Sequence, residues 1–267
     1  MIPPILWVAF AFVGGAIIGS FLNVVIYRVP RGESVATPRS RCPGCGTAIR
    51  PADNIPMVSW IVLRGRCRHC GEAISARYVV VEAATALTWS AFAAWALITP
   101  GALAILPLLL VLASAGIALT VIDIQHRRLP DAIVLPLYPV TVLGLVVAGL
   151  LAGAFPLGST LAGCAVWLGA IGLIWLVTRG RGMGLGDVKL SPILGATLGW
   201  LSLGSAVVGL VAAFLSGALV GVILLAAKRA QRRSAIPFGP FLLLGAASAV
   251  FLGPAISAAY LGITGIS

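Results

Sequence analysis

Charged side chains are scarce in this chain of 267 residues. They make up 9% of the sequence, against roughly 25% in an average soluble domain, whereas hydrophobic residues make up 60%. Such a composition excludes an ordinary soluble protein and indicates that lipid is the main solvent of the chain. A cleavable signal sequence is also lacking. The first apolar run has no basic residues before it and continues to Asn23 and Tyr27, so we expect it to be a retained membrane span.

Apolar runs of about 20 residues, the length that crosses a hydrocarbon core of about 30 Å, recur along the chain. The expected spans are residues 5–27, 78–98, 103–122, 132–151, 157–178, 190–203, 205–227 and 241–260. They predict an all-α polytopic membrane protein with about eight transmembrane helices. The sixth span is short, and Pro192 and Gly195 should loosen it. Irregular backbone at membrane depth is tolerated only where it is buried in protein or lines a wet cavity.

Basic residues are absent from every second connection between these spans. Nine arginines lie within residues 28–77, and the other three groups are Arg127 and Arg128, then Arg179, Arg181 and Lys189, then Lys228, Arg229, Arg232 and Arg233. These four groups contain all 18 basic residues. The positive-inside rule therefore predicts that these connections are cytoplasmic and that both termini are outside.

The net charge of +11 has a simple explanation in this distribution. Basic connections orient the protein and contact the anionic headgroups of membrane lipid. The sequence lacks the interleaved aromatic residues and Gly/Arg repeats that would favour nucleic-acid binding, so we expect no nucleic-acid partner.

Two aspartates are expected on the cytoplasmic side at similar depth. Asp123 follows the third span, and Asp187, 64 residues later, precedes the sixth. A carboxylate at the edge of a membrane is costly, and this suggests a functional role. We predict that the two form an aspartyl protease dyad, in which neighbouring carboxylates share a proton and activate water.

Asp187 stands in the glycine-rich segment Gly182-Met183-Gly184-Leu185-Gly186-Asp187. Two interpretations are open. The segment could be a flexible connection in which the aspartate caps the next helix, or the glycines could allow an extended substrate backbone to approach the carboxylate. Glu82, at the start of the second span, is a further functional candidate; alternatively it lies at headgroup level and pairs with Arg77 or Arg50.

Four of the five cysteines form two Cys-x-x-Cys knuckles within residues 28–77. They are Cys42, Cys45, Cys67 and Cys70, with 21 residues between the knuckles. This spacing favours a tetrahedral thiolate site for Zn²⁺ in a cytoplasmic zinc-ribbon-like loop after the first helix. Disulfide bonds between these cysteines are less expected, because this side of the membrane is reducing. A redox-active cysteine pair is a further alternative to a metal site. His69 could replace one of the cysteines as a metal ligand. Cys164 is expected to be a small buried hydrophobic residue.

These residues resemble those of the bacterial type IV prepilin peptidases, which are bifunctional leader peptidases and N-methyltransferases. The matching segments are Gly19–Arg28, Asp53–Trp60, Leu63–Arg68, Gly184–Asp187, which fits the family's Gly-x-Gly-Asp motif, and Ile236–Pro240. The resemblance covers nearly the whole chain.

The resemblance implies that Asp123 and Asp187 are the protease pair. It also implies S-adenosylmethionine as methyl donor, and prepilins or pseudopilins as substrates that are cut after a glycine and methylated on the new N-terminus. The expected parts are a first transmembrane helix (1–27), a methyltransferase-associated zinc loop (28–77) and a seven-helix membrane peptidase domain (78–267). The rival hypotheses are a peptidase without methylation, a non-enzymatic zinc-ribbon scaffold, and a transporter, which would need acidic residues near mid-membrane.

Overall fold

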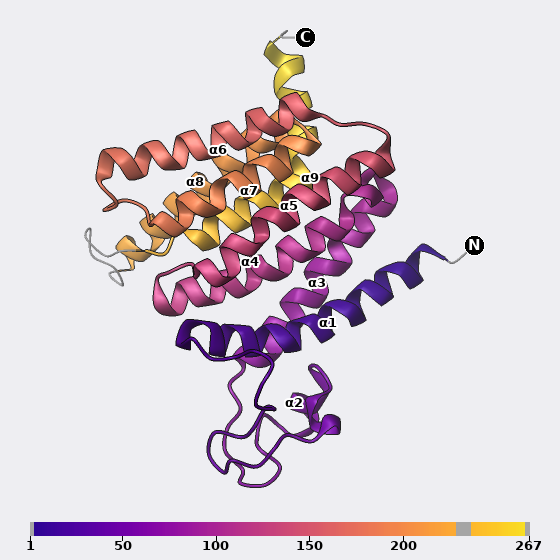
Figure 1. Cartoon of the computed structure of the whole chain (residues 1–267), viewed down its shortest axis with the longest axis vertical. Helices are drawn as coiled ribbons and strands as arrows, with labels where there is room; N and C mark the ends of the chain where they lie inside the picture. Colours follow the sequence, from indigo (N-terminus) through magenta and orange to yellow (C-terminus); the bar gives the residue numbers. More distant parts are fainter. Residues whose placement is uncertain (1–2, 228–235, 265–267) are drawn as a thin grey trace. The chain divides into compact units, whose positions relative to one another are not determined.

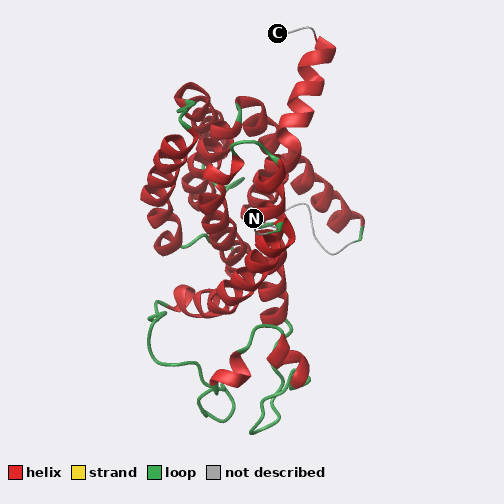
Figure 2. Cartoon of the chain, turned by 90° about the vertical axis from the view of Figure 1, so that its right-hand side faces the viewer, coloured by secondary structure: helices red, strands yellow, loops and turns green. Residues whose placement is uncertain are grey.

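The computed structural model describes residues 3–227 and 236–264, and their regular structure is almost entirely helical (Figure 1). The long helices are α1 (Pro4–Arg28), α3 (Arg77–Ile98), α4 (Leu106–His126), α5 (Asp131–Ala152), α6 (Leu157–Thr178), α7 (Leu185–Leu201), α8 (Leu203–Ala226) and α9 (Gly239–Thr264). The short ones are α2 (Val58–Val62) and the 3₁₀ turns Val29–Arg31, Pro51–Asn54 and Ala102–Ala104. Figure 2 shows that the segment between α1 and α3 is mostly loop.

Seven helices in the described part of the chain are long and apolar enough to cross a membrane, namely all the long ones except α7. The prediction of an all-α membrane protein is therefore confirmed. The short sixth span corresponds to α7, which has 17 residues and begins at Leu185 rather than at Leu190. The basic residues Lys228, Arg229, Arg232 and Arg233, which entered the topology prediction, lie outside the described residues.

The chain forms two compact units, residues 1–118 and 119–267, that divide within α4. In the first unit α1 and α3 pack against each other in antiparallel register. A Cβ on Gly15 would lie 2.8 Å from the Cα of Ala86, and one on Gly19 would lie 2.7 Å from the Cα of Glu82. Small residues that let backbones approach in this way are typical of helix packing in membranes, where lipid removes the hydrophobic drive for association.

In the second unit α7 is a buried helix that contacts α5, α6, α8 and α9. It is continuous through Pro192, and Gly195 does not loosen it as predicted. Instead, a Cβ on Gly195 would collide with the carbonyl oxygen of Gly163 in α6, so glycine allows the two backbones to touch. Four helices therefore pack around α7, whose first turn carries Asp187.

Candidate active site and metal centre

Asp187 lies in the first turn of α7, where its carboxylate caps the helix. Its Oδ2 accepts a hydrogen bond of 3.0 Å from the N–H of Gly184, the N-cap residue. The dipole of the helix favours negative charge at this end. Oδ1 is buried and has no hydrogen-bond partner within the described residues. The capping interpretation therefore accounts for one carboxylate oxygen and leaves the other without a structural role.

Asp123 lies in the last turn of α4 and is 5% exposed. Its Oδ2 accepts a hydrogen bond of 3.1 Å from the N–H of Gly239, the first residue of α9 and 116 positions away in sequence. A Cβ on Gly239 would lie 2.8 Å from that oxygen, so only glycine leaves room for the carboxylate. Each aspartate is thus held by a backbone N–H at the start of a helix.

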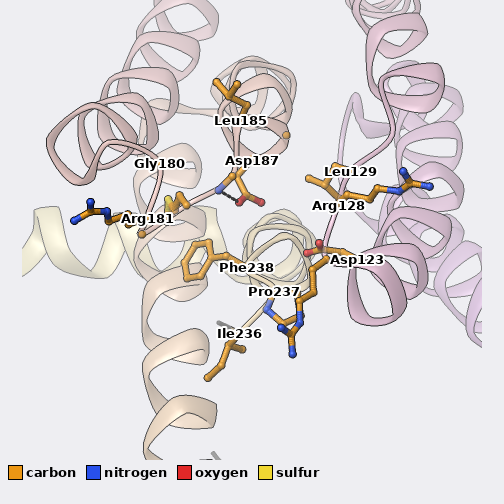
Figure 3. A pocket seen from close by; sticks show the side chains of 15 residues that line it. Asp123, Arg128, Leu129, Gly180, Arg181, Leu185, Asp187, Ile236, Pro237 and Phe238 are labelled. Atoms are coloured by element: carbon orange, nitrogen blue, oxygen red, sulfur yellow. Dashed lines mark hydrogen bonds between the residues drawn. The ribbon is translucent and has the colours of Figure 1, made fainter. Parts of the chain in front are cut away.

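The two aspartates line one cavity of about 320 Å³ within the second unit. They are close enough for their charges to interact, and Figure 3 shows both carboxylates beside the same space. The remaining lining residues are Arg127, Arg128, Leu129, Gly180–Gly186 and Ile236–Phe238. Two carboxylates that share such a space do not both ionise readily. This arrangement is suited to the activation of a water molecule.

Sequence reasoning missed two apolar residues of this cavity, Leu129 and Phe238. Phe238 lies within the segment Ile236–Pro240 that was noted for its resemblance to the family, and it packs against Phe214 of α8 and Phe241 of α9. Leu129, in the connection between α4 and α5, belongs to no motif or periodic pattern. Its place in the site depends on tertiary contacts alone.

Glu82, the further acidic candidate, lies in a different environment from the two aspartates. Glu82 is buried in α3 and accepts a hydrogen bond of 2.7 Å from the N–H of Met57, and the hydroxyl of Ser20 lies within hydrogen-bonding reach of it. Both of these partners are neutral, whereas the alternative interpretation paired Glu82 with Arg77 or Arg50. Met57 has a positive φ of 58°, which is rare for a residue with a side chain. Glu82 therefore attaches the loop after α1 to the pair of helices α1 and α3.

The four predicted cysteines of the first unit form one cluster. Their Sγ atoms lie within 4.8 Å of one another, and those of Cys42 and Cys70 are 3.7 Å apart. Four thiolates around Zn²⁺, each with a Zn–S bond of about 2.3 Å, would lie about 3.8 Å from one another, so the donor set and its spacing fit zinc. The cysteines are free, and His69 is not in the group. Cys164, in α6 of the second unit, is not a member of this cluster and is half-buried rather than buried as expected.

Each knuckle is a small turn closed by glycine. Gly46 and Gly71 have φ values of 68° and 72°, and their N–H groups donate to the carbonyls of Cys42 and Cys67. An ion pair of 2.6 Å between Arg68 and Asp53 attaches the second knuckle to the neighbouring segment. The Arg68 guanidinium holds the pKa of the Asp53 carboxyl below its usual range.

Comparison with protein families gives two adjacent matches. Residues 13–97 match the bacterial peptidase A24 N-terminal domain, and residues 110–226 match the type IV leader peptidase family. The first match contains the cysteine cluster, and the second contains both aspartates of the cavity. No solved structure matches the chain.

Several curated proteins are similar to the chain over most of its length. A prepilin leader peptidase/N-methyltransferase of Aeromonas salmonicida is 38% identical over 97% of this chain and 95% of its own. A protein with the same description from Pseudomonas aeruginosa is 34% identical over 98% and 96%. Another from Myxococcus xanthus is 40% identical over 86% of this chain and 67% of its own.

Proposed function

We propose, from the premise that the chain belongs to the type IV leader peptidase family, that Asp123 and Asp187 are the residues that cleave the prepilin leader. The family and its curated relatives give the activity, which is that of a prepilin leader peptidase and N-methyltransferase. The observation that supports this assignment is the shared cavity. In it, each aspartate has one oxygen held by a helix N-terminus, and the Oδ1 of Asp187 has no partner.

In this proposal the two aspartates act as one unit with a shared proton. The ionised carboxylate takes a proton from water while the water oxygen forms a bond to the scissile carbonyl carbon. The neutral carboxylic acid donates a hydrogen bond to the carbonyl oxygen and stabilises the negative charge that develops there. The C–N bond then breaks, and the departing amine takes a proton from the pair, which returns to its starting state.

The substrate is a prepilin or pseudopilin with a basic leader and a following hydrophobic helix. We propose that this helix enters sideways from the lipid while the leader stays at the cytoplasmic surface. Cleavage after a glycine would release a new N-terminal residue, which the second activity methylates. Because Arg127, Arg128 and Arg181 line the cavity, long-range attraction between opposite charges is a poor account of how a basic leader is recognised.

We assign the cysteine loop, residues 28–77, to the methyltransferase part of the protein. Cys42, Cys45, Cys67 and Cys70 would hold a structural Zn²⁺ that stabilises a loop without a hydrophobic core of its own. S-adenosylmethionine would supply the methyl group. The distribution of basic residues supports a place in the bacterial inner membrane with both termini outside and the cavity facing the cytoplasm.

The experiment that tests the dyad replaces each aspartate by asparagine and follows a co-expressed prepilin by mass spectrometry of its N-terminus. Asp123→Asn and Asp187→Asn should each leave the leader in place, because an amide cannot take the proton from water. Asp131→Asn is the matched control, since Asp131 belongs to the same unit, pairs with Lys189 and does not line the cavity. A cleaving Asp187→Asn enzyme would refute the proposal. The same spectra distinguish an uncut product, a cut product and a cut and methylated product.

A further inference from the structure

Leu129 lies between the two segments that hold the aspartates. It belongs to the short connection between α4 and α5, is 8% exposed, and lines the cavity. Figure 3 shows its side chain beside both carboxylates, at one edge of the space between Asp187 and Asp123. A buried apolar side chain beside two acids cannot exchange protons with them. Any effect on the reaction must therefore arise from its shape.

The Leu129 side chain packs against two glycines, one beside each aspartate: its Cβ, Cγ and Cδ1 face Gly186, and its Cδ2 faces Gly239. A Cβ on Gly186 would lie 2.8 Å from the Cβ of Leu129 and 3.4 Å from its Cδ1. A Cβ on Gly239 would lie 3.2 Å from Cδ2. Gly186 immediately precedes Asp187, and Gly239 donates the hydrogen bond that holds Asp123. Each methyl group of the leucine thus packs against the backbone that positions one of the carboxylates.

We infer that Leu129 is a positioning residue that sets the separation between the carboxylates of Asp123 and Asp187. The inference rests on the proposed function, because it concerns the same dyad. Close-packed side chains transmit small displacements rather than absorbing them. A change in the volume or shape of Leu129 therefore moves the start of α7 relative to the start of α9. Asp187 moves with α7, whereas the N–H of Gly239 that holds the Asp123 carboxylate moves with α9.

The expected effect on catalysis is large because both carboxylates must reach the same water molecule and scissile carbonyl. A misplacement of 1 Å can lower a rate about 10²-fold. We therefore expect Leu129→Ala to lower kcat about 10²-fold while KM for the prepilin changes by less than about threefold, since the remaining walls of the cavity are intact. Leu129→Met retains the volume but not the fork of two methyl groups, and its kcat should lie between those of the alanine variant and the natural enzyme.

The matched control is Leu137→Ala. Leu137 is also buried, at 7% exposure, but it lies in α5 and does not line the cavity. Both alanine variants lose the same buried methyl groups and should show similar falls in thermal stability. Only Leu129→Ala should lose kcat and shift the limbs of the pH–rate profile, which report the coupled titration of the pair.

The inference is overturned if folded Leu129→Ala has a kcat within about threefold of that of Leu137→Ala and an unshifted pH–rate profile. If Leu129→Ala does not fold, the same comparison is made with Leu129→Met, and a natural kcat for that variant overturns the inference equally. Asp187→Asn is assayed in parallel. Activity in that variant would refute the dyad itself, whereas its inactivity together with an unaffected Leu129 variant would refute the positioning role alone.

Discussion

The two glycines that flank Leu185 should differ sharply in their tolerance of alanine. A Cβ on Gly186 would lie 2.8 Å from the Cβ of Leu129, which is closer than nonbonded carbon atoms approach in proteins. A Cβ on Gly184 would lie 3.5 Å from the Oδ2 of Asp187, an ordinary contact, and the φ of Gly184 is −79°. We therefore expect Gly186→Ala to disrupt the site and Gly184→Ala to leave it in place.

The size of the effect follows from the displacement that the added methyl group requires. Carbon atoms settle about 3.5–4.0 Å apart, so Gly186 and Leu129 must separate by about 1 Å. Overpacking of this kind costs about 1–3 kcal/mol. The better helix propensity of alanine in α7 returns up to about 1 kcal/mol, so the loss of stability should be modest. The same displacement applied to Asp187 should lower kcat about 10²-fold, because the neighbouring backbone carries the carboxylate with it.

The assay is the initial rate of leader removal from a purified prepilin in detergent, measured for both variants together with their thermal stability. Gly184→Ala should keep kcat within about threefold, because its N–H still donates to Asp187 and alanine at an N-cap costs about 1 kcal/mol or less relative to glycine. Equal activity of the two variants would show that the contact with Leu129 does not constrain Asp187. Equal inactivity would instead indicate that both glycines serve substrate access.

Two further predictions concern the first unit. Cys42→Ser should lower the zinc content of the purified protein, and it should lower the methylated fraction of a processed pilin more than it lowers cleavage. The control variant Cys164→Ser should change none of these three quantities. Equal loss of methylation and cleavage in Cys42→Ser would mean that the loop also supports the protease. Glu82→Ala should speed limited proteolysis of residues 29–76, because it leaves the N–H of Met57 without its acceptor, which costs about 1–3 kcal/mol. Glu82→Gln, which still accepts from Met57, should be protected, and equal proteolysis of the two variants would contradict this role.

Hydrophobic runs and charge distribution were sufficient to predict the helices and to place Asp123 and Asp187 on the same side of the membrane. The side of the membrane on which each connection lies can be predicted without tertiary information, because each membrane span takes the chain to the opposite side. The boundary at α7 was predicted five residues late because hydropathy begins at Leu190. The helix begins at Leu185 because the hydrogen bond between Asp187 and Gly184 sets its first turn. A polar first turn is invisible to a search for apolar residues.

The contacts that complete the site could not be read from the sequence. Gly239 reaches Asp123 across 116 positions, and Leu129 touches two segments that are remote from each other in the chain. No periodicity relates such residues, because each contact depends on how separate helices pack. The cysteine cluster was easier to predict from the sequence, because the same Cys-x-x-Cys spacing of metal ligands occurs in two separate turns. Their predicted cluster is present because each knuckle is closed by its own backbone hydrogen bonds.

The way in which each carboxylate is held is the reason why we expect neither aspartate to tolerate replacement by its amide. In both, a backbone N–H at a helix start binds one oxygen, and a helix start favours negative charge on that oxygen. The second oxygen of Asp187 is buried with no partner, a costly arrangement unless a proton, water or substrate atom shares it. Asparagine can fill the same space and could turn its oxygen toward the N–H, but its NH₂ group would then face the cavity. A donor there cannot take a proton from water, so the shape of the site would survive while its chemistry would be lost.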